Sequence, residues 1–149
     1  MSARWDVVVA GAGPAGSATA LLLARAGATV LMLDRARFPR EKPCSEYLSP
    51  ESSRVLARLG VLEAVAAAAP ARLTGMRVVA PSGAAVVGRF ENFSYALPRT
   101  RFDTILRDAA ESGGVEVRER VKVEEVLYDR GAVAGVVARD TSSGTRDAY

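Results

Sequence analysis

The spacing of apolar residues changes along this chain of 149 residues. Residues 7–10 form a short continuous apolar run, which predicts a strand buried on both faces. Helical spacing follows from about Pro14 to Ala26, and Gly27 predicts the end of that helix. A second apolar run from Ala28 to Leu33 predicts another strand. The chain is therefore predicted to open with a βαβ unit.

The middle of the chain is predicted to leave this pattern. Ser49 is a predicted helix N-cap with Pro50 at the first helical position, and Gly60 is the predicted helix end. The elements expected here are a proline-rich loop at 36–50, helices at 50–59 and 62–69, a hairpin of strands 76–80 and 84–90 around a turn at 81–83, and a short extended piece at 95–97.

A further helix and three strands are predicted to close the chain. Thr100 is a predicted N-cap with Asp103 as its capping-box partner, and apolar residues at helical spacing follow as far as Gly113. The strands are expected at about 115–118, 121–128 and 132–139. The order predicts an α/β fold in which a Rossmann-like βαβ unit with a parallel sheet carries a small antiparallel β insertion.

Three glycines between the first strand and the first helix have the G-x-G-x-x-G spacing. Gly11 permits a tight turn, Gly13 lets a pyrophosphate approach the backbone, and Gly16 lets the helix pack closely on the sheet. The helix N-terminus favours phosphate, and Asp34, 18 positions after Gly16, can accept hydrogen bonds from ribose hydroxyls. The alternative is a glycine-rich turn that binds no ligand.

Basic residues crowd into the loop after the second strand. Arg35, Arg37, Arg40 and Lys42 either form a solvated loop or fold back as a phosphate or ribose clamp, and the sequence leaves both open. Cys44 has no local catalytic base, so a small buried packing residue is a better expectation than a reactive thiol.

Composition excludes several classes of function. The 49% hydrophobic and 25% charged residues are typical of a globular domain. The net charge of +3 is small and the arginines are scattered along the chain, so the composition does not indicate nucleic-acid binding. Because histidine is absent, Ser-His-Asp and Cys-His catalysis and histidine metal sites are excluded within the chain, and no metal is expected. The single cysteine predicts a cytoplasmic location, and neither a leader nor an integral membrane segment is expected.

Three stretches resemble one group of flavoproteins. The opening at residues 6–35 resembles the FAD-binding βαβ unit of glutathione-reductase-like flavoproteins. Residues 38–52, FPREKPCSEYLSPES, resemble the signature of geranylgeranyl-reductase-type oxidoreductases and related flavin monooxygenases of class A. Residues 97–117, LPRTRFDTILRDAAESGGVEV, are similar to the R-x-x-F-D-x-x-L helix of the same group. The resemblance extends from Asp6 to about Val137.

The resemblance implies FAD as cofactor, with NAD(P)H as its reductant. It implies that Arg99, rather than its neighbour Arg101, reaches the ribityl or pyrophosphate part, and that the backbone of Val123 faces the adenine ring. It also implies that Lys42 and Cys44 line the loop approaching the flavin. The complete set of expected cofactor-binding residues is Gly11, Ala12, Gly13, Pro14, Ala15, Gly16, Asp34, Arg35, Lys42, Cys44, Arg99 and Val123.

Two departures from the family pattern refine this expectation. Cys44-Ser45-Glu46 stands where the family has Cys-Gly-Gly, which favours hydroxylase- or halogenase-like relatives over prenyl reductases. The later A-D-G and G-D segments of the family are not found. We therefore expect residues 1–149 to be the N-terminal part of an FAD/NAD(P)-binding domain, interrupted at about 73–97 by the first strands of a substrate domain.

The function expected from the sequence is that of an FAD-dependent oxidoreductase, foremost an NAD(P)H-dependent flavin monooxygenase of a small organic or secondary-metabolite substrate. The alternatives are a geranylgeranyl-reductase-like enzyme, a flavin-dependent halogenase, an NAD-binding Rossmann domain, or a truncated FAD-binding module without activity of its own. No residue is a convincing acid–base catalyst, which suits chemistry located on a cofactor.

Overall fold

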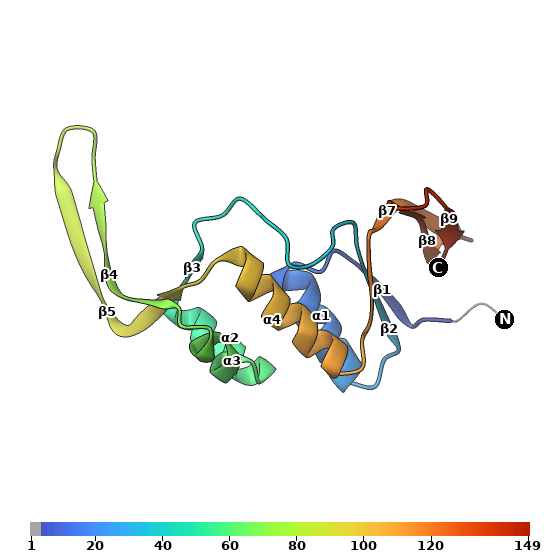
Figure 1. Ribbon diagram of the computed structural model, residues 1–149, viewed down its shortest axis with the longest axis horizontal. Coiled ribbons are helices and arrows are strands. Elements are labelled where there is room, and N and C mark those ends of the chain that lie inside the picture. Colours follow the sequence, from blue (N-terminus) through green and yellow to red (C-terminus); the bar gives the residue numbers. More distant parts are fainter. Residues whose placement is uncertain (1–3) are drawn as a thin grey trace.

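The computed structural model describes residues 4–149 (Figure 1). Its elements are, in chain order, β1 (Val7–Ala10), α1 (Pro14–Arg25), β2 (Val30–Asp34), β3 (Tyr47–Leu48), α2 (Pro50–Leu59), α3 (Leu62–Ala67), β4 (Ala71–Val79), β5 (Ala85–Ala96), α4 (Arg99–Ser112), β6 (Glu116–Glu119), β7 (Val121–Asp129), β8 (Ala132–Asp140) and β9 (Arg146–Ala148). The predicted α/β fold with a parallel sheet is confirmed.

The parallel sheet has the strand order β1-β2-β6. All five residues of the central strand β2 are buried, whereas β1 lies at an edge and is only partly buried. The prediction that residues 7–10 form a strand is thus confirmed, but their expected burial on both faces is wrong. An edge strand has one side without a neighbour, and the fully buried strand is the one between two partners.

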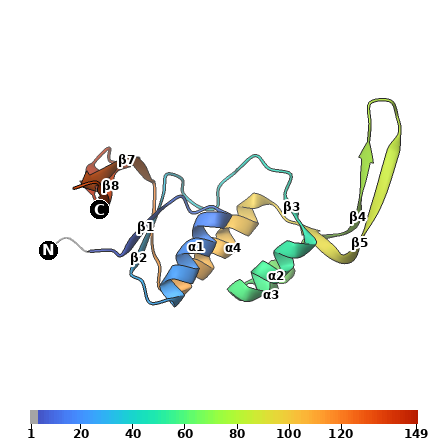
Figure 2. The same ribbon diagram turned by 180° about the vertical axis from the view of Figure 1, so that it is seen from behind.

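Side chains of β2 point alternately to the two faces of the sheet and join two cores. On one face, Met32 packs in the cluster that contains Leu21 of α1 and Leu106 of α4. On the other face, Leu31 packs with Val136 of β8. The helices α1 and α4 lie side by side on the first face, and the β7-β8-β9 sheet lies on the other (Figures 1 and 2). Each fully buried leucine contributes about 1.5–3 kcal/mol of transfer free energy.

The start of α4 differs from the prediction. The helix begins at Arg99 with Pro98 at the N-cap position, and no side chain caps it, so the capping box of Thr100 and Asp103 is wrong. Asp103 is fully buried and binds arginine side chains instead. The helix boundaries predicted at Pro50 and Gly60 are confirmed, and Gly60 is left-handed with φ 71°.

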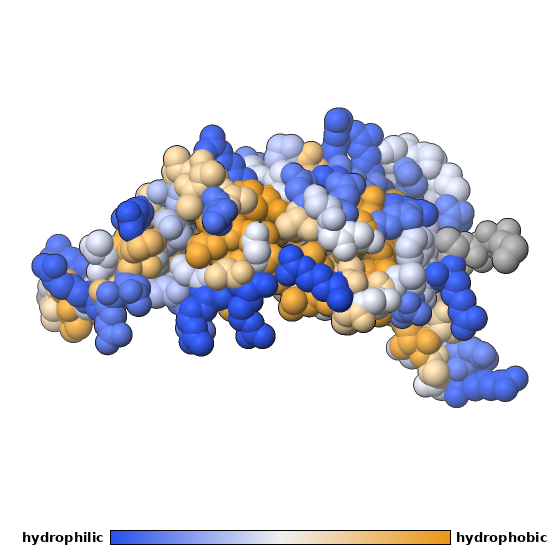
Figure 3. All heavy atoms as spheres, turned by 90° about the horizontal axis from the view of Figure 1, so that it is seen from below, coloured by the Kyte–Doolittle hydropathy of each residue, from blue (hydrophilic) through white to orange (hydrophobic). Residues whose placement is uncertain are grey.

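An antiparallel hairpin of β4 and β5 extends away from the helices (Figures 1 and 2). The separate extended piece expected at 95–97 is the end of the long strand β5. The short strand β3 lies inside the segment predicted as a loop. It pairs with β5 at Tyr47↔Ala96 and Leu48↔Tyr95. Seen from below, the molecule carries hydrophobic patches separated by hydrophilic residues (Figure 3). Whether the hairpin begins a substrate domain stays a prediction.

A second antiparallel sheet, β7-β8-β9, completes the fold. The strands near 115–118, 121–128 and 132–139 are confirmed, but β9 lies in a polar stretch where no strand was expected. The antiparallel part is therefore larger than one insertion. Within residues 4–149, none of the helices has the length and hydropathy to cross a bilayer.

Candidate cofactor-binding site

The glycine-rich turn connects β1 to α1 and is tightly packed. Gly11 has φ 105°, a conformation that favours glycine, and its N–H donates to the Leu33 carbonyl over 2.7 Å. A Cβ atom at Gly16 would collide with the Gly11 carbonyl oxygen. The turn therefore needs glycine at both positions for the steric reasons expected from the sequence.

Gly13 differs from these two glycines because its missing side chain leaves room for a ligand. It is the N-cap residue of α1, with Pro14 directly after it, and its carbonyl accepts the hydrogen bond of Ser17 N–H. The N–H groups at the start of a helix have no intrahelical partner. A Cβ at Gly13 would lie 3.5 Å from Arg40 Nη2 and 4.0 Å from Arg99 Nη2. The open side of the turn thus faces two guanidinium groups.

Asp34 joins the end of β2 to both neighbouring loops. Its Oδ2 accepts a hydrogen bond from Ala12 N–H over 2.8 Å, and its Oδ1 accepts one from Ala36 N–H over 2.8 Å. The side chain is buried. Because each carboxylate oxygen can accept more than one hydrogen bond, Asp34 keeps the capacity to bind a ribose hydroxyl while it holds the turn.

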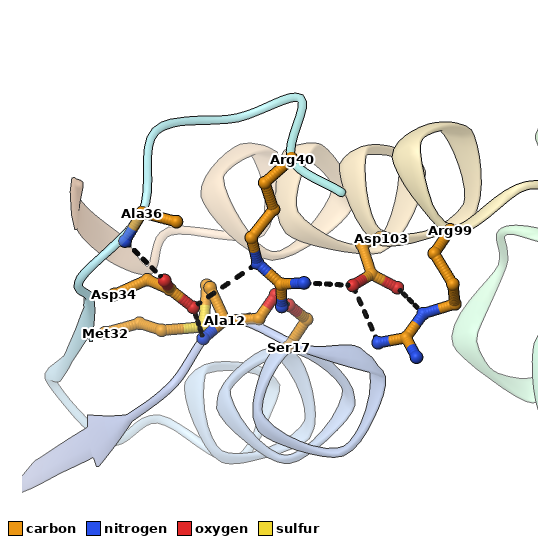
Figure 4. Close-up of polar contacts among 8 residues, drawn as sticks. All are labelled: Ala12, Ser17, Met32, Asp34, Ala36, Arg40, Arg99 and Asp103. Atoms are coloured by element: carbon orange, nitrogen blue, oxygen red, sulfur yellow. Dashed lines mark hydrogen bonds and ion pairs between the residues drawn. The ribbon is translucent and has the colours of Figure 1, made fainter. Parts of the chain in front are cut away.

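Two arginines and two aspartates form a continuous charged row across the site (Figure 4). Arg40 Nε lies 4.0 Å from Asp34 Oδ2, and Arg40 Nη1 lies 3.1 Å from Asp103 Oδ2. Arg99 donates from Nε and Nη2 to the two oxygens of Asp103, over 2.6 and 2.8 Å. This hydrogen bonding to Asp103 raises the pKa of Arg99 above its ordinary value. The row links β2, the basic loop and α4.

A cavity of about 610 Å³ lies beside the glycine-rich turn. It collects most of the residues that the sequence indicated, from four separate stretches of the chain. These are Gly11, Gly13, Pro14, Ala15, Gly16, Asp34, Arg35, Lys42 and Val123. Ala12 is fully buried behind the turn, where its N–H binds Asp34.

Arg99 and Cys44 line a second, largely apolar cavity of about 360 Å³ between α2, α4 and β3. Cys44 is exposed, so the expectation of a buried packing residue is wrong. Its loop runs over the surface, and a hydrogen bond from the Glu46 backbone, followed by the Arg99 guanidinium, lowers the pKa of the thiol. Arg101 turns elsewhere and donates to the Ala68 carbonyl, so Arg99 alone of the two faces the site.

Two residues of the site were not among the expected ones. The sequence indicates Arg40 only as one of several basic residues in a loop, and it predicts a capping role for Asp103. The available signal for Asp103 was its distance of four residues from Arg99, which places both on one side of a helix. Of the basic residues in the loop, Arg40 folds back with its side chain 15% exposed, whereas Arg35 and Arg37 are exposed.

The arrangement fits the ADP half of a dinucleotide. The opening at Gly13 would be filled by a Cβ, and guanidinium groups stand in front of it. Behind it is the N-terminus of α1, which no side chain caps among the described residues. Asp34 lies at the end of the next parallel strand, where dinucleotide folds bind ribose. The residues present can therefore hold a nucleoside diphosphate.

Residues 4–148 match the FAD binding domain family, so the chain belongs to this family of FAD-binding flavoproteins. The glutathione-reductase-like label suggested by the opening motif is imprecise, because the match is to the FAD binding domain family. The chain is 40% identical to the menaquinone reductase of Mycolicibacterium smegmatis over 146 residues, which are 94% of this chain and 35% of that protein. It is 37% identical to digeranylgeranylglycerophospholipid reductase 1 of Methanopyrus kandleri over 134 residues, 89% of this chain and 34% of that protein.

Among solved structures, the myxobacterial chondrochloren halogenase CndH, an FAD-dependent halogenase, is similar with a TM-score of 0.89 and 31% identity. That similarity covers 97% of this chain and 35% of the halogenase. The chain thus spans about a third of the length of the relatives it matches.

Proposed function

We propose that this chain binds the ADP half of FAD in the 610 Å³ cavity and thereby forms the cofactor-binding part of an FAD-dependent oxidoreductase. The observation that carries the proposal is the opening at Gly13, which faces Arg40 and Arg99 at the start of α1, with Asp34 at the end of β2. A diphosphate at Gly13 meets both the helix N-terminus and the guanidinium groups.

The residues of the chain bind and orient the cofactor, which supplies the redox chemistry when bound. In the proposal, Gly13 to Gly16 bind the pyrophosphate, Asp34 binds the adenosine ribose, and the backbone of Val123 faces the adenine. Arg99 and Cys44 stand toward the second cavity, on the side where the flavin end is expected. NAD(P)H as the reductant and a cytoplasmic location are further parts of the proposal.

We propose an isoprenoid-type apolar substrate for the enzyme to which this chain contributes. Two relatives of 40% and 37% identity are named for reduction of menaquinone and of a digeranylgeranyl lipid, and both substrates carry isoprenoid chains. The second cavity supports this choice because its lining is mostly apolar, with Leu48, Leu56 and Phe102 among its residues. A substrate bound mainly by apolar contact suits such a surface.

Oxygen-dependent chemistry, foremost a monooxygenase or halogenase reaction, is the second candidate. Ser45-Glu46 replaces the expected Gly-Gly after Cys44, and the similarity to the chondrochloren halogenase points the same way. This candidate retains the same cofactor site and changes only what the reduced flavin reacts with.

Anaerobic reoxidation of the flavin separates the two candidates. The protein expressed from its complete reading frame is loaded with FAD, reduced with NADPH without oxygen, and mixed with geranylgeraniol while the visible flavin absorbance is followed. A reductase of isoprenoid double bonds recovers the oxidised spectrum without oxygen. Recovery only after oxygen is admitted contradicts the reductase proposal, and a hydroxylated or halogenated product formed at that step supports the second candidate. Reduction by dithionite but not by NADPH or NADH contradicts the proposed reductant.

A further inference from the structure

The guanidinium of Arg40 lies between the proposed ribose and diphosphate positions. Its Nε is 4.0 Å from Asp34 Oδ2, and its Nη2 is 3.5 Å from the position that a Cβ at Gly13 would occupy. Its Nη1 is 3.1 Å from Asp103 Oδ2. Figure 4 shows Arg40 between Asp34 and Asp103. The same guanidinium also lies beside Gly13.

Arg40 is held in this position by contacts on two sides. The guanidinium lies 4.9 Å from the centre of the Phe38 ring, which belongs to the same loop, and it lies against Asp103 from α4. The side chain is only 15% exposed although it carries a full charge. Ordering a long cationic side chain costs conformational entropy, so this placement needs a favourable interaction to offset it.

The hydrogen-bonding capacity of Arg40 is not used up by the protein. Its buried Nη1 makes no hydrogen bond among the described residues, because its approach to Asp103 lacks hydrogen-bond geometry. Its Nη2 points toward the turn at Gly13. An anion placed at Gly13 offers an acceptor to Nη2 and a negative charge beside the guanidinium.

Asp103 explains how two arginines can stand together without an anion. It is fully buried and accepts two hydrogen bonds from Arg99 while it lies beside Arg40. A single carboxylate thus faces two positive charges and stabilises their approach to each other. Both guanidinium groups lie beside Gly13, at the proposed diphosphate position.

We propose that Arg40 binds the diphosphate of the cofactor directly and that Asp103 is a positioning residue that holds Arg40 and Arg99 side by side opposite Gly13. The inference rests on the proposed function and extends it to ligand selection. Two guanidiniums on one side of the turn favour a nucleoside diphosphate over a monophosphate, because the second phosphate brings additional charge and acceptors.

The test is an NMR chemical-shift titration of the 149-residue chain with ADP, AMP and adenosine, which also measures weak binding. Arg40→Gln is expected to weaken the affinity for ADP about tenfold to a hundredfold, the usual effect of losing a charge-assisted hydrogen bond. Adenosine affinity is expected to change less than about twofold, since adenosine has no phosphate. Arg37→Gln, at an exposed position of the same loop, is the matched control and leaves all three affinities unchanged.

Arg40→Lys keeps the charge and is expected to recover part of the ADP affinity, because lysine lacks the planar fork of arginine. Unfolding midpoints from circular dichroism identify any variant that has lost its fold. The inference is overturned if Arg40→Gln binds ADP as tightly as the parent or more tightly. It is also overturned if the affinity for adenosine falls by the same factor as the affinity for ADP. A parent chain that binds neither FAD nor ADP contradicts the proposed function as well. If the parent binds FAD but Arg40→Gln does not lower the affinity for ADP, only this inference is contradicted.

Discussion

The carboxylate of Asp34 accepts a hydrogen bond from the backbone N–H of Ala12 over 2.8 Å. This contact ties the end of β2 to the glycine-rich turn, 22 positions earlier in the chain. The same carboxylate also accepts the N–H of Ala36, at the start of the basic loop. A residue that the sequence indicated only as a ligand for ribose therefore also fixes the shape of the site.

Asp34→Ala is expected to affect both stability and cofactor binding. The substitution leaves the N–H groups of Ala12 and Ala36 without their acceptor, so the free energy of unfolding should fall by about 1–3 kcal/mol. FAD affinity should fall by about 1–3 kcal/mol as well, because a ribose partner is lost. Urea unfolding and a flavin-fluorescence titration measure the two effects, with Asp129→Ala at the exposed end of β7 as control. Unchanged FAD affinity would remove Asp34 from the cofactor site.

Gly13→Val should prevent dinucleotide binding while the fold is kept. The backbone at Gly13, with φ −76° and ψ −178°, is extended and suits a β-branched residue. The added Cβ meets only the ends of the Arg40 and Arg99 side chains. We expect the unfolding free energy to change by less than about 1 kcal/mol and FAD binding to be abolished. FAD binding equal to that of the parent would contradict the phosphate position.

Gly16→Ala is expected to show the opposite behaviour, which makes it a useful partner for the Gly13 variant. Its Cβ collides with the Gly11 carbonyl, a backbone atom that cannot turn aside like a flexible side chain. Overpacking of this kind costs about 1–3 kcal/mol. Thermal unfolding of the two variants should therefore show a lower midpoint for Gly16→Ala than for Gly13→Val, and the reverse order would be evidence against this packing.

Asp103→Asn tests the buried charge on α4. Removing one partner of a buried ion pair leaves Arg99 without its counter-charge and Arg40 without the nearer of its two, so the unfolding free energy should fall by about 3–5 kcal/mol. Asp108→Asn is the matched control on the same helix, where the carboxylate is exposed and the expected loss is below about 1 kcal/mol. Equal denaturant midpoints for the two variants would contradict a stabilising role for Asp103.

The thiol of Cys44 should react with iodoacetamide at lower pH than an ordinary cysteine. The thiolate is the reactive form, and the Glu46 backbone and then the Arg99 guanidinium lower the pKa of this thiol from its ordinary value of 9.0. The alkylation rate, plotted against pH, should reach half its maximum below that value. Labelling is unambiguous because the chain has one cysteine.

Arg99→Gln should move the Cys44 profile to higher pH, since one of the groups that stabilise the thiolate is lost. Arg101→Gln is the control, because Arg101 binds the Ala68 carbonyl and not the thiol. A profile that is the same in the parent and in Arg99→Gln would show that this guanidinium does not act on Cys44.

The glycine-rich turn and the strand that follows the first helix could be predicted because their signals are local. Gly11 needs a positive φ, Gly16 needs close backbone packing, and Asp34 directly ends an apolar run. Each requirement acts on residues that are neighbours in the chain or one helix apart. The same reasoning placed Gly60 correctly at a helix end.

The parts that could not be predicted depend on partners far away in the chain. Residues 47–48 become a strand only because β5 lies beside them, and β9 pairs with β8 despite its polar composition. Asp103 carried the pattern of a helix cap, but burial beside two arginines decides where its side chain points. Local propensity contains no information about such contacts.

Competition between ligands for the 149-residue chain tests the cofactor assignment most directly. FAD is bound first, and its fluorescence is followed while ADP or FMN is added in separate titrations. If the ADP half lies at Gly13 and Asp34, ADP displaces FAD and FMN does not. A chain that binds no FAD, or that releases FAD to FMN and not to ADP, would contradict an ADP site at the glycine-rich turn.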